Sequence, residues 1–179
     1  MKIIGISGRL GTGKDTVAKL IEMCTFTPYQ HRKFAGKLKE MTCLLLGCTL
    51  NQLEDQEFKE RSMGPEWGDI TPRLVMQRMG TEFGRGLYEN LWVKSAMANM
   101  NPEQNYIFTD CRFENEAQAI KNEGGKVILV TRPGKVVKDS HPSETALDNY
   151  HQWDYVLLNE GSMEDLGVKV AAMCKKLNL

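Results

Sequence analysis

The sequence lacks an excess of charge of either sign, because its 23 Lys and Arg residues are matched by 23 Asp and Glu residues. Proteins that bind DNA or RNA polymers usually carry a basic face on a basic domain, so this balance argues against a nucleic-acid polymer as partner. The sequence also lacks any apolar run approaching ~18 residues, the length that suggests a membrane-spanning helix. Met1-Lys2 leads directly into an apolar segment. We therefore expect a cytoplasmic protein with no membrane span and no signal peptide.

Cysteine spacing of the kind that binds metal is also missing. The cysteines are odd in number, and the pair Cys43 and Cys48 is set too widely for a C-x-x-C motif. No internal repeat or low-complexity segment interrupts the 179 residues, which are long enough for a single domain with a substantial core. We interpret all five cysteines as reduced, small hydrophobic residues of a cytosolic protein: Cys24, Cys43, Cys48, Cys111 and Cys174.

What the sequence does contain is a glycine-rich loop between an apolar stretch and a helical pattern. Residues 1–7 are typical of a buried parallel strand, and apolar residues recur at helical spacing after residue 16. The loop between them reads Gly8-Arg9-Leu10-Gly11-Thr12-Gly13-Lys14-Asp15-Thr16. A strand, a glycine-rich turn and a helix are the context that a phosphate-binding loop (P-loop) requires.

The residue types of this loop suit a triphosphate. The glycines let backbone N–H groups point at phosphate oxygens, and the helix N-terminus adds the positive end of its dipole. Lys14 supplies a charge for the β- and γ-phosphates. The alternative is a glycine-rich turn with a surface lysine, which explains neither the spacing nor the context. We predict that the chain binds a nucleoside triphosphate.

One position of the loop departs from the usual pattern. Asp15 stands after the lysine, where most P-loops have Ser or Thr on Mg²⁺, and Thr16 follows with a hydroxyl that can reach a phosphate. An acidic side chain faces the triphosphate here unless a metal ion lies between them, bridged by water. We therefore expect Mg²⁺ at Asp15 and Thr16.

Apolar segments alternate with helical patterns along the rest of the chain, which indicates an α/β fold with a parallel sheet flanked by helices. Ligands of such sheets bind beyond the carboxyl ends of the strands, so Ser7, Asp110 and Arg132 should share one edge. Further strands are predicted at residues 29–35, 105–110, 126–131 and 155–158. Helices are predicted after the P-loop and at residues 37–46, 51–61, 72–79, 87–100, 113–123 and 162–177, with Thr71 and Ser162 as N-caps.

Asp110 and Arg112 follow a predicted buried strand and are candidates for contact with a second substrate. The Asp110 carboxylate suits Mg²⁺ through water or proton abstraction from a hydroxyl acceptor, and the planar Arg112 guanidinium suits bidentate phosphate binding. The alternative is a helix-capping aspartate with an exposed arginine. Glu116 lies one helical turn after Arg112, so an ion pair within the helix is equally consistent with the spacing.

Other positions have both a functional and a structural interpretation. Arg73, in the first turn of its helix, can clamp an acceptor phosphate or be solvated. Trp92 can stack on a base, although at helical spacing it more often belongs to the core. His141 stands in a loop, where a lone histidine is usually exposed. The predicted loop at residues 132–150 can close over the triphosphate or remain a solvated basic loop, and its cations are Arg132, Lys135 and Lys138.

The chemistry of the acceptor narrows the reaction. A phosphomonoester has a second pKa near ~6 and is a nucleophilic dianion at neutral pH. A kinase that phosphorylates a phosphate therefore needs positioning and charge neutralisation but no strong base. Several arginines and the absence of an H-R-D-x-x-x-x-N motif favour a monophosphate acceptor. A hydroxyl acceptor remains an alternative, because Asp110 could act as its base.

A series of motifs runs along the chain in a fixed order: Ser7-Gly8-x-x-x-x-Gly13-Lys14-Asp15-Thr16, Arg73-Leu74-x-Met76-Gln77-x-x-Gly80-Thr81, Trp92-Val93-Lys94, Asp110-x-Arg112-x-x-x-Glu116, Arg132-Pro133-Gly134, His141-x-x-Glu144 and Asn159-x-Gly161-Ser162. Together they resemble the bacteriophage deoxynucleoside monophosphate kinases, nearly end to end. The resemblance implies a P-loop NTPase fold of the nucleoside-monophosphate-kinase type. It also implies transfer of the ATP γ-phosphate, with Mg²⁺, to a deoxynucleoside 5′-monophosphate for dNTP synthesis.

The resemblance also implies roles for single residues. Residues 36–100 of a single kinase domain would be a helical acceptor-binding insertion, residues 132–150 a lid, and Asn159 would lie near the adenine. A homodimer is expected by analogy, in the host cytoplasm if a phage encodes the chain. The ATP phosphates would contact Gly11, Thr12, Gly13, Lys14, Asp15 and Thr16, and the acceptor would contact Arg73, Gly80, Trp92, Asp110, Arg112 and Glu116. Catalysis would depend on Lys14, Asp110, Arg112 and Arg132.

Two departures from the family pattern leave alternatives open. The family can place a basic residue where this chain has Leu10, for which Arg9 is a substitute, and this chain is shorter before Thr71. A second hypothesis is another small-molecule P-loop kinase, of the dephospho-coenzyme A or phosphomevalonate type. A third is a non-catalytic nucleotide switch, which needs D-x-x-G and N-K-x-D motifs that the sequence lacks.

Overall fold

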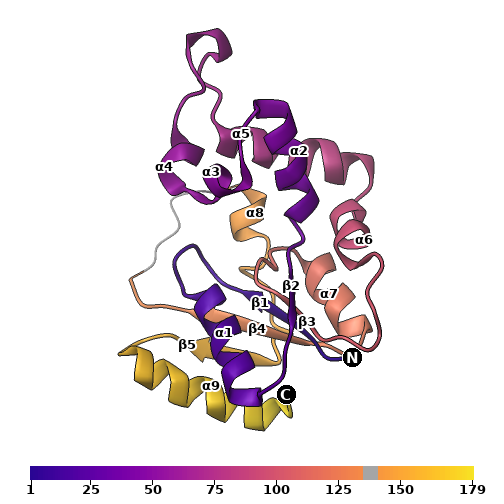
Figure 1. Ribbon diagram of the computed structural model, residues 1–179, viewed down its shortest axis with the longest axis vertical. Coiled ribbons are helices and arrows are strands. Elements are labelled where there is room, and N and C mark those ends of the chain that lie inside the picture. The colour runs from indigo at the N-terminus through magenta and orange to yellow at the C-terminus, as the bar shows by residue number, and fades with distance from the viewer. Residues whose placement is uncertain (135–140) are drawn as a thin grey trace. The chain divides into compact units, whose positions relative to one another are not determined.

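The computed structural model describes residues 1–134 and 141–179. The chain divides into two compact units, coloured along the chain in Figure 1. The first unit contains Met1–Lys33 and Asn99–Leu179, and the second contains Phe34–Ala98. The bounds of the second unit lie within two residues of the predicted helical insertion at 36–100. Its role in acceptor binding stays a prediction.

A five-stranded parallel sheet organises the first unit. Its strand order is β2-β3-β1-β4-β5, so β1 lies at the centre and its carboxyl end leads into the P-loop. Because all pairs are parallel, the carboxyl ends of the strands share one edge, as predicted for the α/β P-loop fold. The strands are β1 (Ile3–Ser7), β2 (Gln30–Arg32), β3 (Tyr106–Phe108), β4 (Lys126–Thr131) and β5 (Tyr155–Leu158).

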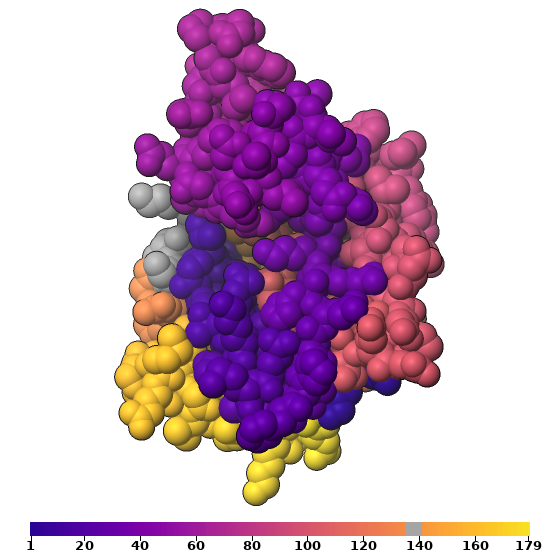
Figure 2. Space-filling model, in the orientation of Figure 1, coloured from indigo at the N-terminus to yellow at the C-terminus, as the bar shows by residue number. Residues whose placement is uncertain are grey.

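Helices cover both faces of this sheet. On one face α1 (Lys14–Thr25) packs beside α9 (Met163–Leu177), and Figure 2 shows these two helices next to each other. Ile4 and Ile6 of β1 are fully buried in the cluster these helices form, and burying an isoleucine side chain contributes roughly 1.5–3 kcal/mol. On the other face, a Cβ on Gly5 would lie 2.3 Å from Cδ1 of Ile120 in α7 (Glu114–Asn122). Glycine at this position therefore lets α7 approach β1.

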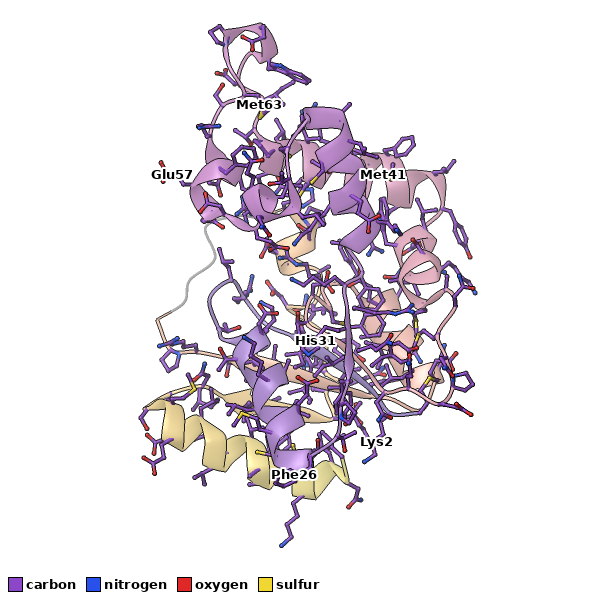
Figure 3. All side chains as sticks on the ribbon, viewed as in Figure 1. Lys2, Phe26, His31, Met41, Glu57 and Met63 are labelled. Atoms are coloured by element: carbon purple, nitrogen blue, oxygen red, sulfur yellow. The ribbon has the colours of Figure 1, made fainter. Side chains whose placement is uncertain are left out.

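Local signals fix the ends of several elements. Ser162 caps α9 as predicted, because its hydroxyl accepts from the Asp165 N–H at 3.1 Å while the Asp165 carboxylate accepts from the Ser162 N–H at 2.8 Å. The bonds that the Ser162 N–H and hydroxyl donate to the Asp165 carboxylate hold the pKa of Asp165 below its usual value. Phe26 ends α1 in a left-handed conformation with φ of 49° and an exposed ring (Figure 3).

The second unit is helical. It contains α2 (Gly36–Leu46), α3 (Leu50–Glu54), α4 (Gln56–Glu60), the 3₁₀ turn η1 (Pro65–Trp67), α5 (Pro72–Gln77), the π-helix η2 (Arg78–Arg85) and α6 (Leu91–Met97). The single helix predicted at 51–61 is two short helices, because Asp55 is extended and its carboxylate accepts from the Phe58 N–H at 2.7 Å to cap α4.

The prediction that the helix starting at Pro72 ends before Gly80 was also wrong, since α5 continues into η2. Thr71 is its N-cap, as predicted: the hydroxyl accepts from the Leu74 N–H at 3.2 Å.

In the predicted loop at 132–150, the described residues 132–134 and 141–150 contain one short helix, α8 (Pro142–Thr145). Lys135 and Lys138 lie outside the described residues. Within the part of the chain that the structure describes, no helix is long and apolar enough to cross a membrane.

Candidate nucleotide site

The P-loop connects β1 to α1 and takes backbone conformations that favour glycine. Gly8 has φ of 149°, and a Cβ there would lie 2.3 Å from the carbonyl oxygen of Val130, so the loop passes directly against β4. Gly13, with φ of 95°, is the N-cap of α1. Gly11 is also left-handed, with φ of 73°. These conformations explain why glycine stands at each of the three positions.

Lys14 lies folded back onto the loop. Its Nζ donates to the carbonyl oxygens of Gly8 at 2.7 Å and Arg9 at 3.0 Å. Burial lowers the pKa of Lys14 below its ordinary value of 10.5, and the neighbouring Arg112 guanidinium lowers it further. Three carboxylates oppose these effects by raising the pKa of Lys14: Asp15, Glu144 and Asp110. The structure thus brings together Lys14, Asp110 and Arg112, which the sequence analysis assigned to one site.

A buried amide braces the P-loop. Nδ2 of Asn159, just after β5, donates to the carbonyl oxygen of Thr12 at 2.7 Å, and the Asn159 side chain lies so close to Gly13 that a Cβ there would meet it at 2.6 Å. The Thr12 hydroxyl donates to the carbonyl oxygen of Arg9 at 2.9 Å. Asn159 therefore contacts the loop predicted to hold the phosphates, while its predicted place near the adenine stays a prediction.

Arg9 connects the P-loop to the segment around α8. Its Nη1 donates to the carbonyl oxygen of Glu144 at 2.7 Å, and its Nη2 lies 2.6 Å from Oδ1 of Asp148. Leu10, the position where the family can carry a basic residue, is 57% exposed. Arg9 therefore donates to the main-chain oxygen of Glu144 and to the carboxylate of Asp148.

The residues expected to hold Mg²⁺ offer hard oxygen donors. The Asp15 carboxylate is exposed and accepts a hydrogen bond from the Thr109 hydroxyl at 2.7 Å, and Thr16 is half-buried. Among residues 1–134 and 141–179, no group of three or more His, Cys, Asp or Glu could hold a metal ion. Mg²⁺ usually keeps several waters and binds one or two carboxylates together with substrate phosphates. The donor set fits that mode of binding.

Arg112 faces the same region. Its Nη1 donates to Oε1 of Glu144 and, at 3.4 Å, to the carbonyl oxygen of Ser143. The possible intrahelical ion pair with Glu116 is not what the structure has. The buried Glu116 carboxylate instead accepts from the main-chain N–H groups of Arg112 at 2.7 Å and Phe113 at 3.2 Å, and so caps α7.

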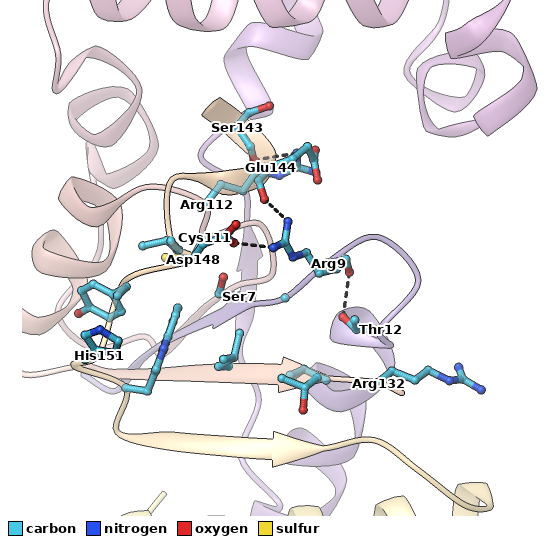
Figure 4. A pocket seen from close by; sticks show the side chains of 17 residues that line it. Ser7, Arg9, Thr12, Cys111, Arg112, Arg132, Ser143, Glu144, Asp148 and His151 are labelled. Atoms are coloured by element: carbon cyan, nitrogen blue, oxygen red, sulfur yellow. Dashed lines mark hydrogen bonds and ion pairs between the residues drawn. The ribbon is translucent and has the colours of Figure 1, made fainter. Parts of the chain in front are cut away.

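A cavity of about 460 Å³ lies between the P-loop, the end of β4 and the segment around α8. Figure 4 shows Arg9, Arg112 and Glu144 converging on one side of it. Arg132 also lines the cavity, but its side chain is exposed and points away from Arg9 and Glu144 in Figure 4. Its predicted catalytic role stays a prediction.

The second unit carries the remaining predicted acceptor residues. Nε of Arg73 lies 2.5 Å from Oε1 of Glu60. Trp92 is buried, its indole N–H donates to the carbonyl oxygen of Gly80 at 2.7 Å, and a Cβ on Gly84 would lie 2.4 Å from its ring. Trp92 therefore packs in the core of this unit, in line with the structural interpretation of its spacing. Acceptor contacts by Arg73, Gly80 and Trp92 stay predictions.

Comparison with known proteins assigns the family. A family model described as "Deoxynucleotide monophosphate kinase" matches residues 56–170. The chain belongs to the deoxynucleotide monophosphate kinase family. A relative in this family, from Acanthamoeba polyphaga mimivirus, is 33% identical over an alignment of 181 positions. The alignment covers 92% of each chain.

Another relative is the "Deoxynucleotide monophosphate kinase" of Enterobacteria phage T4. The two sequences are 31% identical over 134 residues. The matched region covers 72% of this chain and 50% of the phage protein. Among solved structures, the shikimate kinase of Aquifex aeolicus aligns over 97% of this chain and 96% of its own, with TM-score 0.47 and 13% identity. The family assignment rests on the sequence matches.

Several contacts of the candidate site were not predicted from the sequence. Thr109 precedes Asp110 at a strand end, and that position was a signal that could have identified it as a neighbour of the P-loop. Glu144 and Asp148 gave no local signal, because their partners Arg112 and Arg9 lie 32 and 139 positions away. The His141-x-x-Glu144 motif contained Glu144 without indicating its partner.

Proposed function

We propose that this chain transfers the γ-phosphoryl group of ATP to a deoxynucleoside 5′-monophosphate, giving ADP and the deoxynucleoside diphosphate. The observation that carries the proposal is the position of Lys14. It lies on the P-loop within electrostatic reach of Arg112 and Asp110, in a chain of the deoxynucleotide monophosphate kinase family. One anion bound by the loop and one bound by Arg112 would meet above the same sheet edge.

The P-loop residues bind the donor. Main-chain N–H groups around Gly11 and Gly13 and the N-terminus of α1 bind phosphate oxygens. Lys14 Nζ exchanges its contacts with the Gly8 and Arg9 carbonyl oxygens for contacts with the β- and γ-phosphates. Because this charge is partly desolvated, its attraction for phosphate is stronger than that of a surface lysine.

The acceptor needs only binding and orientation. Its phosphate is already a nucleophile at neutral pH, so Arg112 holds it in line with the γ-phosphorus and neutralises charge. Asp110 and Asp15 would hold Mg²⁺ through water, and the ion, when bound, neutralises charge on the β- and γ-phosphates. Asp110 would then help to hold the ion rather than act as a base.

The remaining predictions belong to the same proposal. Residues 34–98 bind the acceptor through Arg73 and Gly80, and residues 132–150 close over the nucleotide, with Arg132 reaching the phosphates. The protein acts as a homodimer in the cytoplasm, which is the host cytoplasm if a phage encodes the chain.

The test is an acceptor screen. The protein is incubated with ATP, Mg²⁺ and single deoxynucleoside monophosphates, ribonucleoside monophosphates or non-nucleotide acceptors, and the products are separated by chromatography. Deoxynucleoside diphosphate is the expected product. Turnover only with dephospho-coenzyme A or phosphomevalonate would support the second hypothesis, and ADP release independent of acceptor would support a nucleotide switch.

Matched lysine variants of α1 locate the activity. Lys14→Ala should abolish turnover while the protein keeps its thermal unfolding transition, because within residues 1–134 and 141–179 the Lys14 ammonium donates hydrogen bonds only to the Gly8 and Arg9 carbonyl oxygens. Lys19→Ala removes an exposed lysine of the same helix and should leave turnover unchanged. Equal activity of the two variants would contradict the proposal.

A further inference from the structure

Glu144 is a largely shielded carboxylate whose function is not explained by the P-loop. Its side chain is only 12% exposed, and Oε1 accepts from Nη1 of Arg112. A carboxylate is seldom buried without a charged partner, because desolvation disfavours its ionised form. The Glu144 carboxylate and the Arg112 guanidinium therefore fix each other's positions.

The pairing leaves one edge of the guanidinium available. Nη1 of Arg112 is used by Glu144 and by the Ser143 carbonyl oxygen, whereas Nε and Nη2 make no hydrogen bond within residues 1–134 and 141–179. Five N–H donors in a planar fork allow a guanidinium to bind a carboxylate with one nitrogen and a phosphate with the others. The edge formed by Nε and Nη2 is suited to a phosphate.

Three contacts determine the orientation of this edge. Glu116 fixes the main chain at Arg112 through the N–H bond at 2.7 Å, and Glu144 and Ser143 fix the far end of the side chain. A long arginine otherwise loses considerable rotamer entropy when it binds an anion. With both ends fixed beforehand, binding a phosphate costs less entropy.

Glu144 also offsets repulsion between two cations. Arg112 lies near enough to Lys14 to lower the pKa of the lysine, and Glu144 acts in the opposite direction. Without the carboxylate, the guanidinium would relax away from the Lys14 ammonium into solvent. The acceptor phosphate would then bind farther from the transferred group.

We propose that Glu144 is a positioning residue that holds Arg112 in the orientation that binds the acceptor phosphate. The inference rests on the proposed function, in which Arg112 binds the deoxynucleoside monophosphate. Glu144 itself touches no substrate and acts through Arg112. Its main-chain oxygen, which binds Arg9, is unaffected by a change of side chain.

A double-mutant cycle tests the inference. Glu144→Gln should raise the KM for the deoxynucleoside monophosphate by about ten- to a hundredfold, the scale of a displaced binding group, with the KM for ATP changed by less than about twofold. In an Arg112→Ala background the same substitution should change the acceptor KM by less than about twofold, because the effects of residues that act as a unit are not additive. Independent, additive effects would overturn the inference.

Controls separate this outcome from general damage. Glu22→Gln removes a carboxylate that lies 3.1 Å from His31 in the same unit and should leave both KM values unchanged. Glu144→Ala serves as a second variant, and thermal unfolding of each protein checks the fold. The affinity for deoxynucleoside monophosphate, measured by calorimetry without ATP, gives a readout that needs no turnover. If the unmodified protein binds acceptor but forms no diphosphate, the proposed function fails. The double-mutant cycle, measured by calorimetry, then still tests the pairing of Glu144 with Arg112.

Discussion

Asn159 and Thr12 are separated by 147 positions in the sequence, yet Nδ2 of Asn159 lies 2.7 Å from the carbonyl oxygen of Thr12. This bond joins the segment after β5 to the middle of the P-loop. The Asn159 main-chain N–H donates to the carbonyl oxygen of Thr131 at 2.8 Å, so the side chain is anchored from β4. The conformation of the P-loop is therefore fixed partly from the end of the last strand, β5.

Replacing Asn159 should loosen the P-loop. Asn159→Ala leaves the buried carbonyl oxygen of Thr12 without its donor, and such a loss costs about 1–3 kcal/mol. We expect a lower free energy of unfolding in urea and a higher KM for ATP, with the acceptor KM changed less. Asn178→Ala, at the C-terminal end of α9, is a control for the same substitution away from the loop and should leave the KM for ATP unchanged.

The pH dependence should report the depressed pKa of Lys14. Because burial and Arg112 lower this pKa, the ammonium loses its proton at a lower pH than a free lysine with its pKa of 10.5. The value of kcat/KM for ATP, which reports the free enzyme, should fall along an alkaline limb with a midpoint below 10.5. Glu144→Gln removes a group that raises the pKa of Lys14, so the limb should move to still lower pH. A limb that moves to higher pH would contradict the assignment.

Glu116 should contribute both to stability and to acceptor binding. Glu116→Ala removes the carboxylate that accepts two main-chain N–H bonds at the start of α7, a loss of about 0.5–2 kcal/mol for a helix cap. Because one of these N–H groups belongs to Arg112, the acceptor KM should rise as well. Glu114→Ala, an exposed change in the same helical turn, is the control for both measurements. Equal stability of the two variants would contradict the capping role.

Trp92 should act as a core residue of the second unit. Trp92→Phe removes the indole N–H that donates to the Gly80 carbonyl oxygen, and loss of this buried hydrogen bond costs about 0.5–1.5 kcal/mol. The expected result is a lower urea midpoint. Trp67 is 39% exposed, so Trp67→Phe should change the free energy of unfolding by less than about 0.5 kcal/mol. A large loss of acceptor affinity without a loss of stability would instead favour the stacking role.

Local patterns were sufficient to predict the sheet and the P-loop. The strand, the glycines and the helix of residues 3–25 lie next to one another in the sequence, and the caps at Thr71 and Ser162 depend on residues three positions away. Signals of this range are present in the sequence itself. They predicted the parallel sheet and placed the candidate site residues at the carboxyl ends of its strands.

Pairings between distant segments could not be predicted in the same way. The bond from Asn159 to Thr12 and the ion pair of Arg112 with Glu144 depend on how the strands are ordered, which no short motif encodes. The prediction of one continuous helix at residues 51–61 failed for a different reason. The charged segment at 51–61 has the composition of one helix, but the aspartate forms a cap in the middle of it.

The π-helix at Arg78–Arg85 has a consequence for comparing this chain with its relatives. An α-helix turns by about 100° per residue, whereas a π-helix accommodates one more residue per turn. Deleting one residue here would restore the regular repeat and rotate Gly84 away from the Trp92 ring that now packs on it. Alignments through this segment should therefore be anchored on Gly80, Gly84 and Trp92 together, since continuous helical spacing would assign the wrong residue to the indole.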